Sequence, residues 1–197
     1  IQHTDWLASS AMRDALAASD FDLAELKARA TTVYLVLPPH YLEIHKRFLR
    51  LFVNLTLRAA SDGGRSRVPI WMCLDEFYSL GRMDSVLKAV ANSRSYNVRL
   101  HLILQNRSQL EELYPGNWES FVANAGTTQV FGLNDPCTEG YVAQKLGKAT
   151  LIGEARDVHG NIVRRPVGTA MLRDPSEVAR EVSRDGDRQI IFREGAD

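Results

Sequence analysis

The chain has 197 residues, of which 45% are hydrophobic and 24% are charged, and its 24 lysines and arginines balance 24 aspartates and glutamates. This composition is typical of a globular protein with a sizeable core, and it excludes a largely disordered chain. The zero net charge argues against a broad basic surface for nucleic acid or membranes, and no apolar run approaches the roughly 18 residues of a membrane-spanning helix.

The sequence contains no targeting, disulfide or metal-binding motif. It starts with Ile1 rather than Met, in the polar run IQHTDW, so we expect a piece of a longer protein and no signal peptide here. Cys73 and Cys137 lie far apart without a partner motif, which favours free thiols in a reducing compartment. The five histidines show no ligand spacing, so a zinc site is not expected.

In the first half of the chain, hydrophobic periodicity predicts helices and strands in alternation. In chain order we expect helices at residues 6–19 and 21–30, a strand at 31–37, a helix at 41–60, a strand at 68–74, a helix at 84–93 and a strand at 98–104. The run TTVYLVL at 31–37 is apolar or β-branched throughout, which is typical of a strand buried on both faces, and Pro38-Pro39 ends it.

The second half continues the alternation and adds a hairpin. We expect helices at 107–113 and 118–124, a strand at 127–132, a helix from Pro136 to the residue before Gly147, a β-hairpin within 149–171, a short helix after Asp174 and a strand at 188–192. Asp174 and Glu177 form a capping-box pattern at the start of that short helix. Strands that alternate with helices predict an α/β fold with a mainly parallel sheet flanked by helices.

Polar side chains follow two of the expected strands, where ligands bind in open α/β sheets. Asp75 and Glu76 come directly after the strand at 68–74, and Gln105 follows the strand at 98–104. An apolar strand that ends in Asp-Glu is the Walker B pattern of ATPases, but it also occurs where a loop simply reaches solvent. Gln105 is suited to hold a water or a phosphate oxygen. Arg94 closes the intervening helix, where a cation also favours the helix C-terminus.

Two long motifs at these positions resemble one protein family. The run LDEFYSLGRM at 74–83 resembles the LDEF-x-x-LG signature of the TraG/TraD-type coupling proteins of bacterial type IV secretion and conjugation. The run ILQNRSQLEELYPGNW that starts at Ile103 is similar to the family's ILQ-x-x-SQL-x-x-xYG motif, and the similarity covers nearly the whole chain. The resemblance implies a RecA-like P-loop NTPase motor fold.

The resemblance also implies an ATP site with Mg²⁺. By it, Asp75 supports Mg²⁺ through a water, Glu76 is the catalytic carboxylate and Gln105 senses the γ-phosphate. In hexameric relatives an arginine of the neighbouring subunit reaches the phosphates and supplies charge in the transition state. Arg94 is the first candidate for that arginine finger, and the alternatives are Arg82 and Arg99.

One family motif is absent, because no G-x-x-x-x-G-K-[ST] occurs in the 197 residues. The phosphate-loop strand is therefore missing, and the chain alone is expected to be inactive, since nothing cradles the nucleotide's phosphates. The resemblance puts the phosphate loop, a membrane anchor and an all-helical insertion upstream of residue 31. We expect residues 1–30 to be the end of that insertion and 31–197 to be the C-terminal part of the RecA-like nucleotide-binding domain.

These features predict part of a type IV secretion coupling-protein ATPase. By the resemblance, the full-length protein is a membrane-anchored homohexamer on the cytoplasmic face of the bacterial inner membrane. It passes relaxase-bound DNA or effector proteins to the secretion channel. One alternative is a degenerate, non-hydrolysing docking module for a relaxase or effector. Another is a different ring DNA translocase, which the stretch SQLEELYPGNW disfavours.

The apolar residues near the motifs have simpler explanations. We expect Phe77 and Leu80 to pack the loop after the strand against the core, and Gly81 to serve a turn. Trp118 and Phe121 are spaced for one helix face and are expected to anchor that helix in the core rather than to stack on bases.

Overall fold

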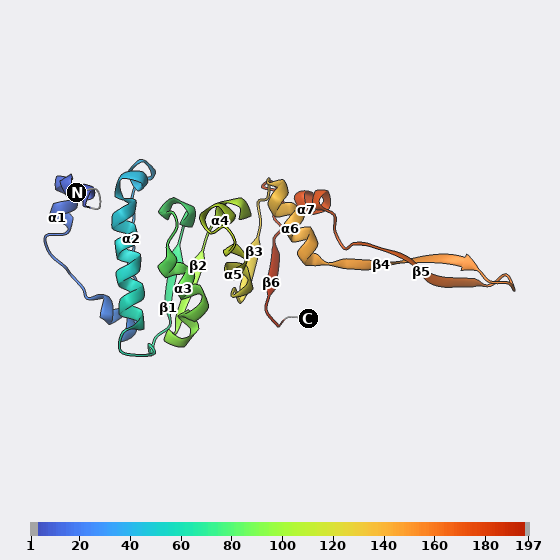
Figure 1. Cartoon of the computed structure of the whole chain (residues 1–197), viewed down its shortest axis with the longest axis horizontal. Helices are drawn as coiled ribbons and strands as arrows, with labels where there is room; N and C mark the ends of the chain where they lie inside the picture. Colours follow the sequence, from blue (N-terminus) through green and yellow to red (C-terminus); the bar gives the residue numbers. More distant parts are fainter. Residues whose placement is uncertain (1–3, 196–197) are drawn as a thin grey trace. The chain divides into compact units, whose positions relative to one another are not determined.

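The computed structural model describes residues 4–195, so Ile1 and His3 lie outside the described residues (Figure 1). The chain divides into two compact units. Unit 1 runs up to Gln105 and includes Gln109–Ala125, and unit 2 contains Asn106–Ser108 and the described residues from Gly126 onward. Within residues 4–195, no helix combines the length and the hydropathy needed to cross a bilayer.

Unit 1 contains a long helix, a pair of strands and shorter helices after each strand. Its elements are η1 (Asp5–Ala8), α1 (Ser10–Ala15), η2 (Leu23–Lys27), α2 (Pro39–Ser61), β1 (Ile70–Leu74), η3 (Phe77–Leu80), α3 (Asp84–Asn92), η4 (Ser93–Tyr96), β2 (Val98–Leu102), the part of α4 (Arg107–Leu113) from Gln109 onward, and α5 (Trp118–Ala123). Compared with the prediction, the helix at 6–19 is divided into η1 and α1, and the helix at 21–30 is the short 3-10 segment η2.

Strands β1 and β2 pair in parallel, with Ile70 opposite Val98 and Leu74 opposite Leu102. Burial alternates along β1, where Ile70, Met72 and Leu74 are buried while Trp71 is 69% exposed. The apolar run at 68–74 therefore forms a strand that is covered on one face within the described chain.

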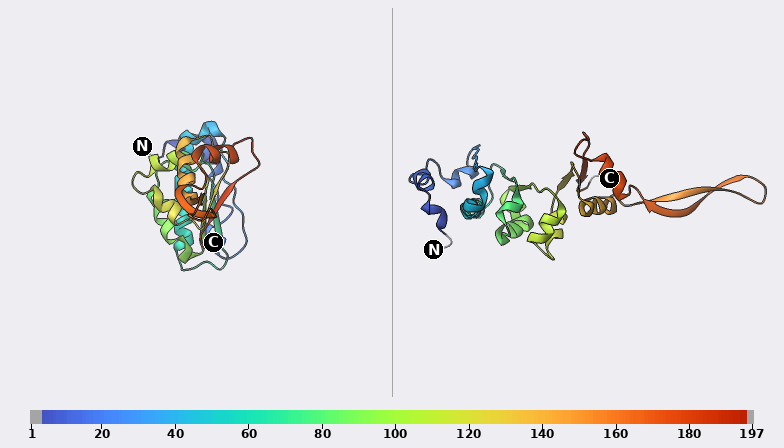
Figure 2. Two further views of the ribbon diagram at one scale, coloured as in Figure 1. Left: turned by 90° about the vertical axis from the view of Figure 1, so that its right-hand side faces the viewer. Right: turned by 90° about the horizontal axis from the view of Figure 1, so that it is seen from above.

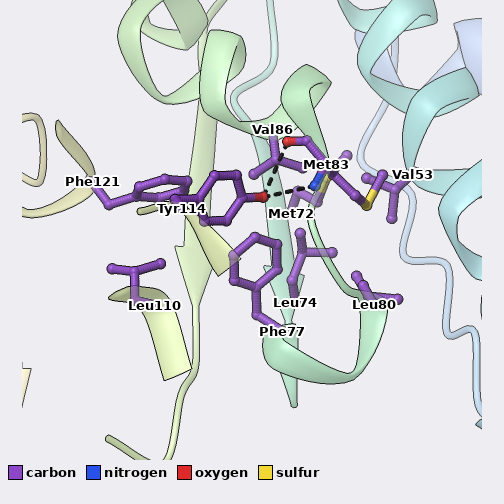
Figure 3. Packing of buried hydrophobic residues seen from close by; sticks show 10 residues of the cluster. All are labelled: Val53, Met72, Leu74, Phe77, Leu80, Met83, Val86, Leu110, Tyr114 and Phe121. Atoms are coloured by element: carbon purple, nitrogen blue, oxygen red, sulfur yellow. Dashed lines mark hydrogen bonds between the residues drawn. The ribbon is translucent and has the colours of Figure 1, made fainter. Parts of the chain in front are cut away.

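The buried face of β1 contributes to the core of unit 1, in which aromatic rings contact one another. Phe77, Val86 and Tyr114 are fully buried, and the rings of Tyr114 and Phe121 lie 4.6 Å apart (Figure 3). The Tyr114 hydroxyl accepts a hydrogen bond from the Met83 N–H at 2.9 Å and donates one to the Met83 carbonyl at 3.1 Å. Burial raises the pKa of the Tyr114 phenol.

The core confirms the structural roles predicted for the apolar residues near the motifs. Phe77 and Leu80 are buried in η3, and Gly81 ends that segment with a φ of +70°, a conformation that favours glycine. Phe121 is buried, and Trp118 packs against the same cluster.

The strand predicted at residues 31–37 is wrong, because the structure has no strand there. Tyr34 is 85% exposed and Val36 is 79% exposed. An apolar strand is buried on both faces only when other strands and helices surround it, and no described residue pairs with this segment. Apolar composition alone therefore does not make this segment a strand among residues 4–195.

Unit 2 contains two antiparallel strand pairs and two helices. Its elements are β3 (Thr127–Val130), α6 (Pro136–Leu146), β4 (Lys148–Arg156), β5 (Ile162–Met171), α7 (Pro175–Glu181) and β6 (Ile190–Arg193). Strand β3 pairs with β6, and β4 pairs with β5. The α/β class is confirmed, but β1–β2 is the one parallel pair among residues 4–195, so the sheet content differs from the mainly parallel sheet predicted.

The helix ends of unit 2 follow the predicted capping chemistry. Asp135 caps α6 by accepting hydrogen bonds from the Thr138 hydroxyl at 2.5 Å and from the Thr138 N–H at 2.9 Å. These bonds, the hydroxyl first, lower the pKa of Asp135. Gly147 ends the helix with a φ of +86°, and Asp174 and Glu177 form the capping box of α7.

The hairpin predicted within 149–171 is confirmed as β4–β5. In unit 2 it extends away from α6 and α7 as a two-stranded ribbon (Figures 1 and 2). The register shifts between Leu151 and Ile152, and a Cβ on Gly153 would lie 2.6 Å from a methyl group of Val167. Because Gly153 has no side chain, the Val167 side chain can occupy this space.

Tyr114→Phe is expected to destabilise unit 1. The substitution keeps the ring but leaves the buried Met83 N–H without its acceptor, which costs about 1–3 kcal/mol. Urea denaturation measures the change in the free energy of unfolding. Tyr34→Phe is the matched control, because Tyr34 is 85% exposed, and it is expected to stay within about 0.5 kcal/mol of wild type. Equal stability of the two variants would contradict this account of the core.

Candidate functional site

The parallel pairing of β1 and β2 brings Asp75, Glu76 and Gln105 to one edge of the sheet. The hydrogen-bond pattern continues past the strands, since the Ile103 N–H donates to the Leu74 carbonyl and the Phe77 N–H donates to the Ile103 carbonyl, each at 3.1 Å. The two loops are thus joined directly beyond the strand ends. This edge, at the carboxyl ends of the strands, is where ligands bind in open α/β sheets.

The central contact of the site joins Glu76 and Gln105. The Gln105 amide nitrogen Nε2 lies 3.3 Å from Oε2 and 3.4 Å from Oε1 of Glu76, so the amide donates to the carboxylate. Both side chains are exposed. An exposed carboxylate beside an amide donor is open to solvent, as a group that activates a water must be.

The backbone of Glu76 is held in an unusual conformation. Its φ of 48° and ψ of 46° lie in the left-handed region, which costs a residue with a side chain about 1–2 kcal/mol. Asp75 Oδ1 accepts the Glu76 N–H at 3.0 Å, and the N–H and hydroxyl of Ser79 donate to the Glu76 carbonyl at 2.9 and 2.8 Å. Such strain persists where the surroundings fix it, and it is common at functional sites.

Asp75 suits a magnesium ion that is held jointly with a nucleotide, because Mg²⁺ usually keeps several waters and one or two carboxylates beside the phosphates. The Asp75 carboxylate is exposed, and one of its oxygens accepts the Glu76 N–H. Across residues 4–195, no cluster of three or more histidine, cysteine, aspartate or glutamate side chains could bind a metal alone. The Asp75 carboxylate is therefore suited to hold Mg²⁺ indirectly, through a water molecule.

The three candidate arginines occupy different places. Arg94 lies in η4, before β2, while Gln105 follows β2, and the five residues of that strand span about 16 Å. Arg94 is therefore not brought to Glu76 within the chain. Arg82 lies in the loop before α3, where it forms an ion pair with Asp84 at 3.0 Å, and Arg99 lies exposed within β2.

Sequence reasoning missed the side chains of α4 that contact both loops of the site. Gln109 Oε1 accepts the Gln105 N–H at 2.9 Å, and Glu112 Oε2 accepts the Tyr78 hydroxyl at 2.9 Å. The hydrogen bond to Glu112 is the main cause that raises the pKa of the Tyr78 phenol. The signal that could have found Gln109 is its place one helical turn after Gln105.

Curated relatives share this region at low identity. The chain is 28% identical over 177 residues to the protein VirD4 of Agrobacterium fabrum, which covers 85% of this chain and 26% of VirD4. It is 28% identical over 179 residues to the conjugal transfer protein TraG of Escherichia coli, which covers 84% of this chain and 27% of TraG. The chain thus spans about a quarter of the length of these relatives.

Solved structures of the bacterial conjugative coupling protein TrwB share the fold. The unbound form aligns with a TM-score of 0.67 at 19% identity, over 81% of this chain and 38% of TrwB. The complex of TrwB with ADP and Mg²⁺ aligns with a TM-score of 0.60 at 20% identity, over 82% of this chain and 38% of TrwB. The RecA-like fold expected from the sequence is therefore confirmed.

The sequence resemblance, the TrwB-like fold and the relatives all point to one family. The family model for conjugative DNA transfer in the type IV secretory system matches residues 2–160, a span that contains Asp75, Glu76, Gln105 and Gln109. Because this match includes well over half of the chain, the protein belongs to the type IV secretory system conjugative DNA transfer family.

Proposed function

We propose that this chain is the C-terminal part of the nucleotide-binding domain of a coupling-protein ATPase that drives conjugative DNA transfer. The observation that most supports the proposal is the contact between Glu76 and Gln105 beyond paired parallel strands. It lies within the region matched by the family. TrwB was solved with ADP and Mg²⁺, with an ATP analogue and with a GTP analogue, which supports a purine nucleotide as the ligand, and the family resemblance favours ATP.

Each site residue has a role in this proposal. Bound Mg²⁺ would supply positive charge to the phosphates, and Asp75 would hold one of its waters. Glu76 would orient the attacking water and accept its proton at a carboxylate oxygen. The Gln105 amide, which now donates to Glu76, would also reach the γ-phosphate. Arg94 would act from a neighbouring subunit, with Arg82 and Arg99 as the alternatives.

The wider assembly belongs to the same proposal. Residues 1–30 would be the end of an all-helical insertion, and residues 31–197 the C-terminal part of the motor domain. The full-length protein would contain an upstream phosphate loop and a membrane anchor, and would form a homohexamer at the cytoplasmic face of the inner membrane. Its partners would be relaxase-bound DNA or effector proteins and the components of the secretion channel.

Glu76→Gln in the full-length protein is expected to lower ATP turnover about 10²–10⁴-fold, since the amide cannot accept a proton. The measurement is Mg²⁺-dependent phosphate release, together with titration of a labelled ATP analogue, whose affinity is expected to persist. Glu119→Gln on α5 is the matched control, because it makes the same change at an exposed residue outside the site, and its turnover is expected to equal wild type.

Two results would contradict the proposal that the full-length protein hydrolyses ATP. Turnover that survives Glu76→Gln would contradict the role of this carboxylate. Absence of both turnover and analogue binding in the full-length protein would favour the docking module for a relaxase or effector. The coding frame upstream of residue 1 offers an independent check, because the proposal expects a G-x-x-x-x-G-K-[ST] motif there.

Arg94→Ala and Glu76→Gln are each expected to inactivate the hexamer, whereas a mixture of the two variants is expected to regain part of the turnover. In mixed hexamers some interfaces pair an intact Arg94 with an intact Glu76 from the adjacent subunit. Loss of an arginine finger lowers the rate about 10³–10⁵-fold. Arg82→Ala and Arg99→Ala are compared in the same assay. If Arg94→Ala alone kept full turnover, Arg94 would not be the arginine finger, and Arg82 or Arg99 would take that role.

A further inference from the structure

Helix α4 is fixed in the core of unit 1 by its apolar side. Leu110 is 5% exposed, and Tyr114, directly after the helix, is fully buried and hydrogen-bonded to the Met83 backbone (Figure 3). A helix held in this way is a rigid support for loops that contact its other residues.

The polar side chains of α4 contact the two loops of the site. Gln109 and Glu112 are three positions apart, so they lie on neighbouring turns of one helix face. Gln109 accepts the backbone N–H of Gln105, and Glu112 accepts the hydroxyl of Tyr78, which lies two residues after Glu76. One helix therefore holds both the Gln105 loop and the Glu76 loop.

The hydrogen bond from the Gln105 N–H to Gln109 orients the Gln105 backbone more than it adds to the free energy of folding. Gln105 is exposed, so its N–H could bond to water if Gln109 were removed, and little folding free energy would be lost. The Gln105 side chain starts from the atom next to this N–H. Without the acceptor, the amide would no longer be held within 3.3–3.4 Å of the Glu76 carboxylate.

We propose that Gln109 is a positioning residue that sets the Gln105 amide against Glu76 by accepting the Gln105 backbone N–H. The inference rests on the ATP hydrolysis proposed above. In this proposal Gln109 acts through the loop that carries Gln105, whose backbone N–H it accepts.

The test uses Gln109→Leu and Gln109→Glu in the full-length protein. Gln109→Leu has a similar size without an acceptor, and it is expected to lower kcat about 10- to 100-fold, because small misplacements of catalytic groups cost up to about 10²-fold. The KM for ATP and the melting temperature are expected to stay at the wild-type values. Gln109→Glu keeps an acceptor oxygen and is expected to regain most of kcat.

A readout without ATP makes the inference separable from the proposed function. Hydrogen–deuterium exchange of the peptide that contains Gln105 is expected to be faster in Gln109→Leu and close to wild type in Gln109→Glu. The matched control is Gln144→Leu, which makes the same change at an exposed position of α6 and is expected to alter neither kcat nor this exchange.

Three results would overturn the positioning role. They are wild-type kcat and exchange in Gln109→Leu, equal impairment of Gln109→Glu and Gln109→Leu, and a rate loss that is explained by a lowered melting temperature. A wild-type protein without turnover would contradict the proposed function, and the inference would fall with it. That outcome is seen before any substitution and is thus distinct from a failure of Gln109 alone.

Discussion

The candidate site depends on the parallel pairing of β1 with β2, in the register that sets Leu74 opposite Leu102. Parallel strands end at the same edge, so the loop with Asp75 and Glu76 meets the loop with Gln105. The Leu74, Phe77 and Ile103 backbone bonds then join the loops beyond the last paired residues. A slip of one residue would turn the buried side chains of β1 to solvent and separate the two loops.

The core of unit 1 holds the loops at the carboxyl ends of β1 and β2 in place. Phe77 lies directly after Glu76 and is fully buried, so the strained turn at Glu76 is fixed on its C-terminal side. Tyr114, directly after α4, is hydrogen-bonded to the Met83 backbone. Helix α4 in turn contacts the Gln105 loop through Gln109. Exposed polar groups of the site are thus positioned by buried apolar neighbours.

The sequence predicted the strand ends and caps well, because these features depend on local residues. The sequence places Asp75, Glu76 and Gln105 directly after apolar runs, and the structure brings the Glu76 and Gln105 side chains together there. Asp135 caps its helix as its position before Pro136 predicts. The strand predicted at 31–37 is wrong because strand pairing depends on neighbours distant in sequence, and no described residue pairs with this segment. The contact of Gln109 was not predicted, because the spacing of four residues from Gln105 allows this hydrogen bond but does not show that it forms. The antiparallel β3–β6 pair also depends on contacts distant in sequence.

In the proposed mechanism, Glu76 and Gln105 act as one unit in ATP hydrolysis. The most direct measurement is a double-mutant cycle on kcat in the full-length protein, with Glu76→Gln, Gln105→Ala and the double variant. If two residues act as a unit, removing either one removes the effect of both. The kcat of the double variant is therefore predicted to be no lower than that of the slower single variant. Losses that multiply would show that the two residues act independently and would contradict the account.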